Sequence, residues 1–400
     1  MRIAKIETHV LLVPDCDPGA NSSAQDNIVV EIHTDEGLTG IGEVDTNPWV
    51  AQAMIHAKGT HALGLGLEEM LLGEDPLHVE ALWDKMYAGS LMTGRRGLGI
   101  CAMGALDMAL WDLRGKYLNQ PCWFFLGGAK KEFVTPYASL LPVGMTLKEQ
   151  RDSLVAKAGE SRRLGFKAGK MEICVKGPYA HHRLQEGDEA IVEIAAACRE
   201  AVGRDYVMMV DVCYGWANAK EALRTMRQLE PYDIFFIETP LPVDDIDGLA
   251  YLHDHSPIRI ASGELNNGRF EFLELMDRGK VDVAQPDVGR VGGFTEARRV
   301  CEMAADRGRQ IVPHCWKSGI GIAASAHLSA ANPHCPYIEF LPGSLSESAL
   351  QRELVVDEME MIDGEIPIPQ KPGLGVEINR AALTEYRVSH RISEASEGRG

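Results

Sequence analysis

The feature that most constrains the fold is a series of ionisable residues that each follow an apolar run in the second half of the chain. They are Asp211 (after YVMMV), Glu238 (after IFFI), Glu264 (after IRIASG), Asp287 (after VDVAQP), His314 (after QIVP) and Glu339 (after PYI). Neighbouring members lie 23 to 27 residues apart, which is about the length of one strand, one helix and two short loops. Because parallel strands end at the same edge of a sheet, we expect the six side chains to meet at one end of a βα barrel.

The same repeat of strands and helices defines the domains. From about residue 134, eight strand-like runs alternate with helix-like segments, which is enough to close a barrel. Before residue 130 the chain reads as a hairpin followed by helices, including a buried helix in CAMGALDMALWDLRGKYL whose small residues allow close packing. We therefore predict an α+β domain over 1–130, a barrel over 131–345, a segment over 346–390 that returns to the first domain, and a frayed tail over 391–400.

Composition excludes several classes of partner. A net charge of −18 argues against nucleic acid and anionic membranes. The chain has no apolar run long enough for a membrane span, and its N-terminus lacks the pattern of a signal peptide, so we expect neither. The nine cysteines are scattered without a CxxC pair. This pattern predicts reduced, mostly buried cysteines in a cytoplasmic enzyme.

Three of the strand-end residues form a candidate metal site. Asp211, Glu238 and Glu264 end consecutive predicted strands, and three unpaired carboxylates at one point would repel one another strongly. Oxygen ligands with open positions suit Mg²⁺. The alternative is that each carboxylate pairs with a nearby Arg or Lys. We favour the metal because no matched set of three cations is visible.

The neighbouring predicted strands supply acid–base groups. Asp287 beside His314 would fix the tautomer and raise the pKa of the imidazole, as in a general base or acid, although His314 could instead be a satisfied core residue. Lys170, at the end of FKAGK, could act as a base, hold a substrate carboxylate, or be a surface lysine. Glu172 follows on the same strand face. A protonated Glu339 could donate to a substrate carboxylate oxygen.

Two other patterns are interpreted as non-functional. His181 and His182 in GPYAHHRLQEGDE suggest a metal site, but the segment is polar, and we favour a solvated loop. The glycines in GVEIN and GRVGGF lack GxGxxG spacing before a helix, so no dinucleotide site is predicted.

The motifs together resemble the enolase superfamily, specifically its mandelate racemase subgroup, over essentially the whole chain. The matching motifs are GALDMALWDLRGK at 104–116, LGG at 126–128, GFKAGK ending at 170, IETP around Glu238, SGE ending at Glu264, QPDVGRVGG around Asp287, PHCWKSGIG around His314, IEF around Glu339, and Asp211 with Trp216. The resemblance implies an α+β capping domain on a modified TIM barrel of (β/α)7β type. It implies Mg²⁺ on Asp211, Glu238 and Glu264, and a His314–Asp287 dyad. It also implies removal of the proton alpha to a substrate carboxylate, with the metal stabilising the enolate.

The resemblance also implies that loops 14–27 and 45–50 cover the site, with Trp49 and Trp316 as candidate substrate-binding residues. The chain departs from the subgroup at two positions. Lys-x-Lys on the second strand is replaced by Lys170-Met-Glu172, and the usual Asn after the third-strand Asp is replaced by Cys213. Because the second lysine is the base on that side, its loss weakens the racemase interpretation. We expect Lys170 to hold the substrate carboxylate electrostatically. We expect Glu172 either to pair with Lys170, which would keep it protonated, or to contact a substrate hydroxyl.

The predicted function is dehydration of a sugar acid, an aldonate or an aldarate, to a 2-keto-3-deoxy acid. The alternatives are a cycloisomerase or epimerase that uses the same enolate chemistry, and a carboxylate-binding homologue without turnover. The expected partner is a small-molecule carboxylate, and we expect a homo-oligomer.

Overall fold

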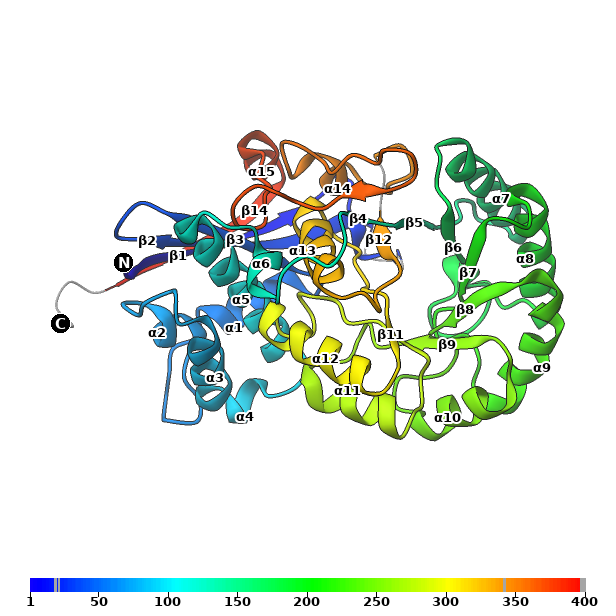
Figure 1. The fold of residues 1–400 in the computed structure, drawn as a ribbon, viewed down its shortest axis with the longest axis horizontal. Coiled ribbons are helices and arrows are strands. Elements are labelled where there is room, and N and C mark those ends of the chain that lie inside the picture. The colour runs from blue at the N-terminus through cyan, green and yellow to red at the C-terminus, as the bar shows by residue number, and fades with distance from the viewer. Residues whose placement is uncertain (18–19, 21, 341–342, 396–400) are drawn as a thin grey trace.

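The computed structural model describes residues 1–17, 20, 22–340 and 343–395. At one end of the molecule lies an antiparallel sheet in the order β14-β1-β2-β3 (Figure 1). Its strands are β14 (Arg387–Glu394), β1 (Ile3–Leu12), β2 (Asp26–Thr34) and β3 (Thr39–Val44). The helices of this part are α1 (Pro48–Ile55), α2 (Leu67–Leu71), α3 (Val79–Gly89), α4 (Leu91–Gly94), α5 (Leu98–Leu118) and α6 (Cys122–Phe125).

The second half forms an eight-stranded parallel sheet in the order β11-β10-β9-β8-β7-β6-β5-β12. Its strands are β5 (Pro136–Leu140), β6 (Ala168–Glu172), β7 (Val207–Asp211), β8 (Ile234–Glu238), β9 (Arg259–Ser262), β10 (Val283–Ala284), β11 (Gln310–Ile311) and β12 (Ile338–Phe340). The helices between them are α7 (Leu147–Arg163), α8 (Asp188–Val202), α9 (Ala219–Leu229), α10 (Ile246–His255), α11 (Gly268–Asp277), α12 (Phe294–Asp306) and α13 (Gly319–Ala331). Eight strands with seven intervening α-helices confirm the predicted (β/α)7β barrel with an α+β capping domain.

The chain then returns to the capping sheet. After the barrel come α14 (Ala349–Glu353), β13 (Ile366–Pro367), which pairs with β4 (Phe133–Val134), and α15 (Arg380–Tyr386). Strand β14 pairs with β1 from Lys5–Glu394 to Leu11–Arg387. The frayed tail predicted from residue 391 is therefore wrong for 391–394, because backbone pairing with β1 orders these polar residues; 396–400 lie outside the described residues. Three short 3-10 turns complete the described elements: Ser23–Gln25, His181–Arg183 and Glu230–Tyr232.

Helix α5 joins the two halves by close backbone packing. It is buried on all sides, as its small residues predicted. A Cβ on Gly42 of β3 would lie 2.1 Å from the Ala105 carbonyl oxygen, and one on Gly104 would lie 1.8 Å from the Gly289 carbonyl oxygen. Only glycine permits such approaches. The second contact presses α5 against the loop after β10, which carries Asp287.

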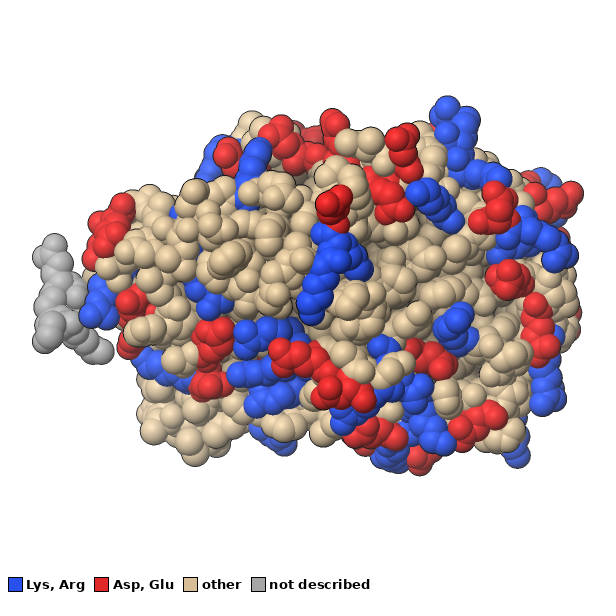
Figure 2. Space-filling view, viewed as in Figure 1, with Lys and Arg blue, Asp and Glu red and all other residues tan. Residues whose placement is uncertain are grey.

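The surface shows no dominant basic region on its visible face, where acidic and basic side chains are interspersed (Figure 2). Within the described residues, no helix is long and apolar enough to cross a membrane.

The buried His327 of α13 offers a stability test. Its Nδ1 accepts a hydrogen bond from the Trp123 backbone N–H (3.2 Å), and its Nε2–H donates to the Leu374 carbonyl (3.0 Å), so it joins the barrel to α6 and to the returning segment. Burial lowers the pKa of His327 to about 4. The unfolded chain therefore binds the extra proton first, and this stability is present above pH 6.5 and lost as the pH falls toward 4.

We predict that this group accounts for about 3 kcal/mol of acid destabilisation in the free energy of unfolding. Denaturant titrations at several values between pH 7.5 and 4 would measure it. His327→Gln keeps the donor to Leu374 but cannot be protonated, so its unfolding free energy should fall less steeply with acid. The exposed His255→Gln should behave like the wild type, and equal slopes for all three proteins would contradict the prediction.

Candidate active site

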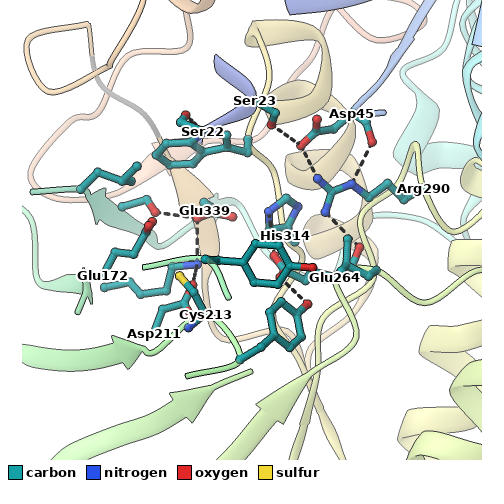
Figure 3. Close-up of a pocket in the computed structure, with 17 residues that line it drawn as sticks. Ser22, Ser23, Asp45, Glu172, Asp211, Cys213, Glu264, Arg290, His314 and Glu339 are labelled. Carbon is teal, nitrogen blue, oxygen red and sulfur yellow. Dashed lines mark hydrogen bonds and ion pairs between the residues drawn. The ribbon is translucent and has the colours of Figure 1, made fainter. Parts of the chain in front are cut away.

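A cavity of about 350 Å³ opens where the barrel strands end. Its wall comes from both halves of the molecule: Ser22, Ser23 and Asp45 from the capping domain, and Ser139, Leu141, Lys170, Glu172, Tyr179, Asp211, Cys213, Tyr214, Glu264, Leu265, Arg290, His314, Trp316 and Glu339 from the barrel (Figure 3). The side chains predicted from strand ends therefore meet at one end of the barrel, with Glu238 and Asp287 lying just behind the wall.

Asp211, Glu238 and Glu264 gather here through strand register. Asp211 is paired with Glu172 on one side and Glu238 on the other. Asp211 Oδ1 accepts from the Cys213 N–H and the Thr239 hydroxyl, both at 2.8 Å, and Glu264 Oε1 accepts from the Tyr214 hydroxyl at 2.6 Å.

The electrostatics of these carboxylates suit a divalent cation. Burial and the charge of Glu238 raise the pKa of Asp211 well above its ordinary value, and burial also raises the pKa of Glu238. Each carboxylate has its own donors, and across the described chain their oxygens do not all lie within 4.8 Å of one another. The donor set nevertheless fits a hard ion such as Mg²⁺, because all three groups are carboxylates, and Asp211 and Glu238 share one lysine as their closest positive charge.

That lysine is Lys170, which is 3% exposed. Its Nζ lies 2.5 Å from Glu238 Oε1, 3.1 Å from Glu339 Oε1 and 3.8 Å from Asp211 Oδ2. Burial alone would lower the pKa of Lys170, but these carboxylates raise it well above its ordinary value. Lys170 is therefore protonated, as predicted, but the expected pairing with Glu172 is wrong, because Glu172 bonds elsewhere.

Glu339 is held as an acceptor. Its Oε1 accepts from Ser139 Oγ at 2.6 Å, and its Oε2 accepts from the Cys315 N–H at 2.7 Å. Burial alone would raise the pKa of Glu339, but the charges of Lys170 and His314 outweigh burial and lower this pKa below its ordinary value. The predicted role of a protonated Glu339 donor does not match this arrangement, because donors already surround both of its oxygens.

His314 and Asp287 form the predicted dyad. His314 Nδ1 lies 2.9 Å from Asp287 Oδ2, while Nε2 lies 3.2 Å from Glu264 Oε2. Burial and the charge of Arg290 lower the pKa of His314, but the bond to Asp287 and the charges of Glu339 and Glu264 outweigh them and raise it. Asp287 Oδ1 accepts from the Arg290 N–H, which fixes the carboxylate behind the imidazole.

Strand alternation did not reveal the Arg290–Asp45 pair. Arg290 Nη2 forms an ion pair with Asp45 Oδ2, and Arg290 Nε donates to the Asp45 carbonyl at 2.9 Å. Asp45 directly follows β3, so the sequence signal that could have identified it is an acidic residue at the end of a strand. Lys317 also contacts Asp45 (3.1 Å) and Asp26 (2.7 Å), which ties the capping loop to the barrel.

The two tryptophans have different outcomes. Trp316 lines the cavity and donates from Nε1 to Ser22 Oγ at 2.9 Å. Trp49 is 47% exposed and is absent from the cavity wall formed by the described residues, so its predicted position is wrong. The reason is local: Asn47 caps α1 with Pro48 at its first turn, so Trp49 lies in the first turn of this helix, where its side chain is exposed.

Glu172 is held by His181, which the sequence pattern places in a solvated loop. His181 Nε2 lies 2.7 Å from Glu172 Oε1, and the His181 side chain is 12% exposed. Burial alone would lower the pKa of His181, but Glu172 raises it. The solvated-loop interpretation is therefore wrong for His181, whereas His182 is exposed.

A disulfide joins Cys174 to Cys213 beside this pair, across 39 residues of sequence. The prediction of reduced cysteines is therefore wrong for these two. Each follows the end of one of two neighbouring strands, β6 and β7, and such proximity leaves no signature in sequence spacing. The other seven cysteines are free, and all but Cys16 are buried.

Known proteins share this architecture. Residues 153–382 match the family described as enolase C-terminal domain-like, and residues 19–127 match the mandelate racemase / muconate lactonizing enzyme N-terminal domain. The D-galactarolactone cycloisomerase of Agrobacterium fabrum is 30% identical, with 97% of this chain and 99% of that protein covered. The arabinonate dehydratase of Saccharolobus solfataricus is 32% identical, with 90% of each covered.

A solved structure supports the same relationship. The crystal structure of the 3,6-anhydro-D-galactonate cycloisomerase from Zobellia galactanivorans superposes with a TM-score of 0.83 at 31% identity, covering 97% of this chain and 100% of that one. The family matches span most of the chain, and they agree with the barrel and its capping domain. The chain therefore belongs to the enolase superfamily, in its mandelate racemase and muconate lactonizing enzyme group.

Proposed function

We propose that this protein is a Mg²⁺-dependent dehydratase of a sugar acid that forms a 2-keto-3-deoxy acid. The observation that carries the proposal is His314, whose Nδ1 is held by Asp287 and whose Nε2 lies at the carboxylate cluster. Relatives named as dehydratases of arabinonate and D-galactonate support the reaction class.

Asp211, Glu238 and Glu264 would hold the metal ion. When bound, Mg²⁺ supplies Lewis-acid stabilisation for the negative charge that develops on the substrate carboxylate as the α-proton leaves. Lys170 is already a cation among carboxylates, so it would contribute positive charge near the substrate carboxylate and would be a poor base. Glu172 would contact a substrate hydroxyl through its oxygen that faces away from His181.

His314 would carry the proton between substrate positions. Asp287 holds the Nδ1 proton, so the Nε2 lone pair can take the α-proton. The imidazolium then returns this proton to the β-hydroxyl, the carbon–oxygen bond breaks, and the hydroxyl leaves as water. The resulting enol tautomerises to the 2-keto-3-deoxy acid.

A cycloisomerase is the second candidate. It is favoured by the 30% identity to a D-galactarolactone cycloisomerase across almost the full length of both chains. The same His314 step would begin this reaction, but the product would keep the atoms that a dehydratase releases as water.

A substrate panel tests the proposed reaction. We expect purified protein with Mg²⁺ to convert at least one aldonic or aldaric acid to a 2-keto-3-deoxy acid, measured by mass spectrometry as loss of one water. Conversion of a lactone without loss of water would instead identify the cycloisomerase. Binding of every tested acid without turnover would contradict both.

His314→Asn should abolish proton transfer while preserving the fold. We expect kcat to fall about 10²–10⁴-fold, the usual contribution of a positioned general acid–base group, with an unchanged Tm and unchanged Mg²⁺ affinity. Asp287→Asn should lose activity less completely, because the imidazole remains but its tautomer is no longer fixed. His255→Asn, on an exposed helix end, serves as the control. Near-normal turnover by His314→Asn would remove it from the mechanism.

The metal assignment has its own readout. Asp211→Asn should weaken Mg²⁺ binding, measured by calorimetry, by at least about 10–100-fold. Removing a residue that only supports a metal ligand already costs this much affinity. Asp205→Asn, an exposed carboxylate near the opposite end of the same strand, should bind Mg²⁺ as the wild type does. Equal affinities for the two variants would refute the three-carboxylate site.

A further inference from the structure

The Cys174–Cys213 disulfide links the segments that follow two neighbouring barrel strands, next to the proposed metal ligands. Cys174 comes shortly after β6 and Cys213 shortly after β7, and the pairing of these strands brings the two segments together. Cys213 belongs to the cavity wall, where Figure 3 places it beside Asp211. Cys174 is fully buried and is not among the described residues of that wall. The cross-link therefore joins the surface of the cavity to a buried segment of the barrel.

The turn at Cys213 and Tyr214 holds two of the three proposed metal ligands. The Cys213 backbone N–H donates to Asp211 Oδ1 at 2.8 Å, and the Tyr214 hydroxyl donates to Glu264 Oε1 at 2.6 Å. Asp211 ends β7 and Glu264 follows β9, and β8 lies between these two strands in the sheet. One turn therefore fixes the orientation of carboxylates on both sides of the proposed metal site, so a movement of the turn changes both.

The backbone of this turn has an unusual conformation. The angle φ is 46° at Cys213 and 60° at Tyr214, in the left-handed region that residues other than glycine rarely occupy. Such residues persist only where the surrounding structure holds them. The Tyr214 N–H donates to the Thr239 carbonyl at 2.7 Å, which restrains one of them. The disulfide adds a covalent restraint at the other.

Loss of the disulfide would displace Cys213 more than Cys174. Once the S–S bond is broken, the two thiols need the separation of non-bonded atoms, so the two segments must part. The Cys174 carbonyl accepts from the His181 N–H at 3.0 Å, and the Cys174 side chain is enclosed by protein. Cys213 is half-buried against a cavity of about 350 Å³, which gives its side chain room to move. We therefore expect the turn at Cys213 to shift.

We infer that the Cys174–Cys213 disulfide positions the proposed metal ligands Asp211 and Glu264, so that its reduction by a small dithiol reversibly weakens Mg²⁺ binding and slows turnover. In this role both cysteines act through the two carboxylates and not on the substrate. The inference rests on the metal site of the proposed function, and it holds for dehydration and for cycloisomerisation.

The reduction is a thiol–disulfide exchange. A thiolate of the dithiol attacks the Cys213 sulfur from the cavity, the S–S bond breaks, and the Cys174 sulfur leaves with the electron pair and takes up a proton. The second thiol of the reagent then attacks the mixed disulfide, which releases Cys213 as a thiol and the reagent as its cyclic disulfide. The protein gains two electrons and two protons, and the dithiol loses them.

Calorimetry on the two redox forms tests the inference. Peptide mapping without reductant should first find Cys174 bonded to Cys213 in the purified protein. Protein reduced with dithiothreitol, and then freed of the reagent without air, should bind Mg²⁺ about 10–100-fold more weakly than the oxidised protein, the loss expected when a metal ligand loses its support. Reoxidation with oxidised glutathione should restore the affinity. Turnover of any acid accepted in the substrate panel should fall and recover in the same order.

Two variants separate positioning from general stability. Cys174→Ser removes the cross-link and leaves Cys213 in place, so it should bind Mg²⁺ as weakly as the reduced wild type and should not respond to dithiothreitol. Cys16→Ser removes an exposed free cysteine and should respond as the wild type does. A disulfide with a purely structural role would lower the Tm of Cys174→Ser without changing its Mg²⁺ affinity. If Cys174→Ser does not fold, the comparison of the two wild-type forms decides.

The outcomes separate this inference from the proposed function. Equal Mg²⁺ affinities of oxidised and reduced wild-type protein would overturn the inference and leave the metal site and the dehydratase proposal standing. Free thiols at Cys174 and Cys213 before any reductant is added would overturn it as well. If neither redox form binds Mg²⁺, the three-carboxylate site fails, and the inference fails with it.

Discussion

The burial of several carboxylates around a single ammonium group is the constraint on which the site depends. Lys170 Nζ lies within 3.8 Å of Asp211, Glu238 and Glu339, and isolated buried charges of this kind would be costly. Parallel register brings these acids together, so the barrel cannot form without concentrating negative charge at one end. The excess negative charge makes this end of the barrel suited to a divalent cation.

The capping domain completes the site through charge pairing across the domain boundary. Asp45 follows the capping strand β3 and meets both Arg290 and Lys317 from the barrel. Close packing makes this possible: the contact between Gly104 and Gly289 brings α5 against the loop that carries Arg290. The packing of α5 and the chemistry of the cavity are therefore linked, because the loop after β10 takes part in both.

Residues at the ends of the repeating barrel strands could be predicted from the sequence, whereas contacts between separate loops could not. Asp211, Glu264 and His314 could be placed because each ends a strand, and strand ends share one edge. The pairing of His181 with Glu172 and the Cys174–Cys213 disulfide depend on how the loop after β6 folds back, which sequence spacing does not report.

The sequence by itself determined the barrel, the capping domain and the set of strand-end acids, because hydrophobic periodicity and parallel register are local or repeating properties. Only the tertiary structure decided which charges neutralise one another. It paired Lys170 with Glu238 and Glu339. The physical reason is that an ion pair depends on distance in space, and these partners come from strands far apart in the chain.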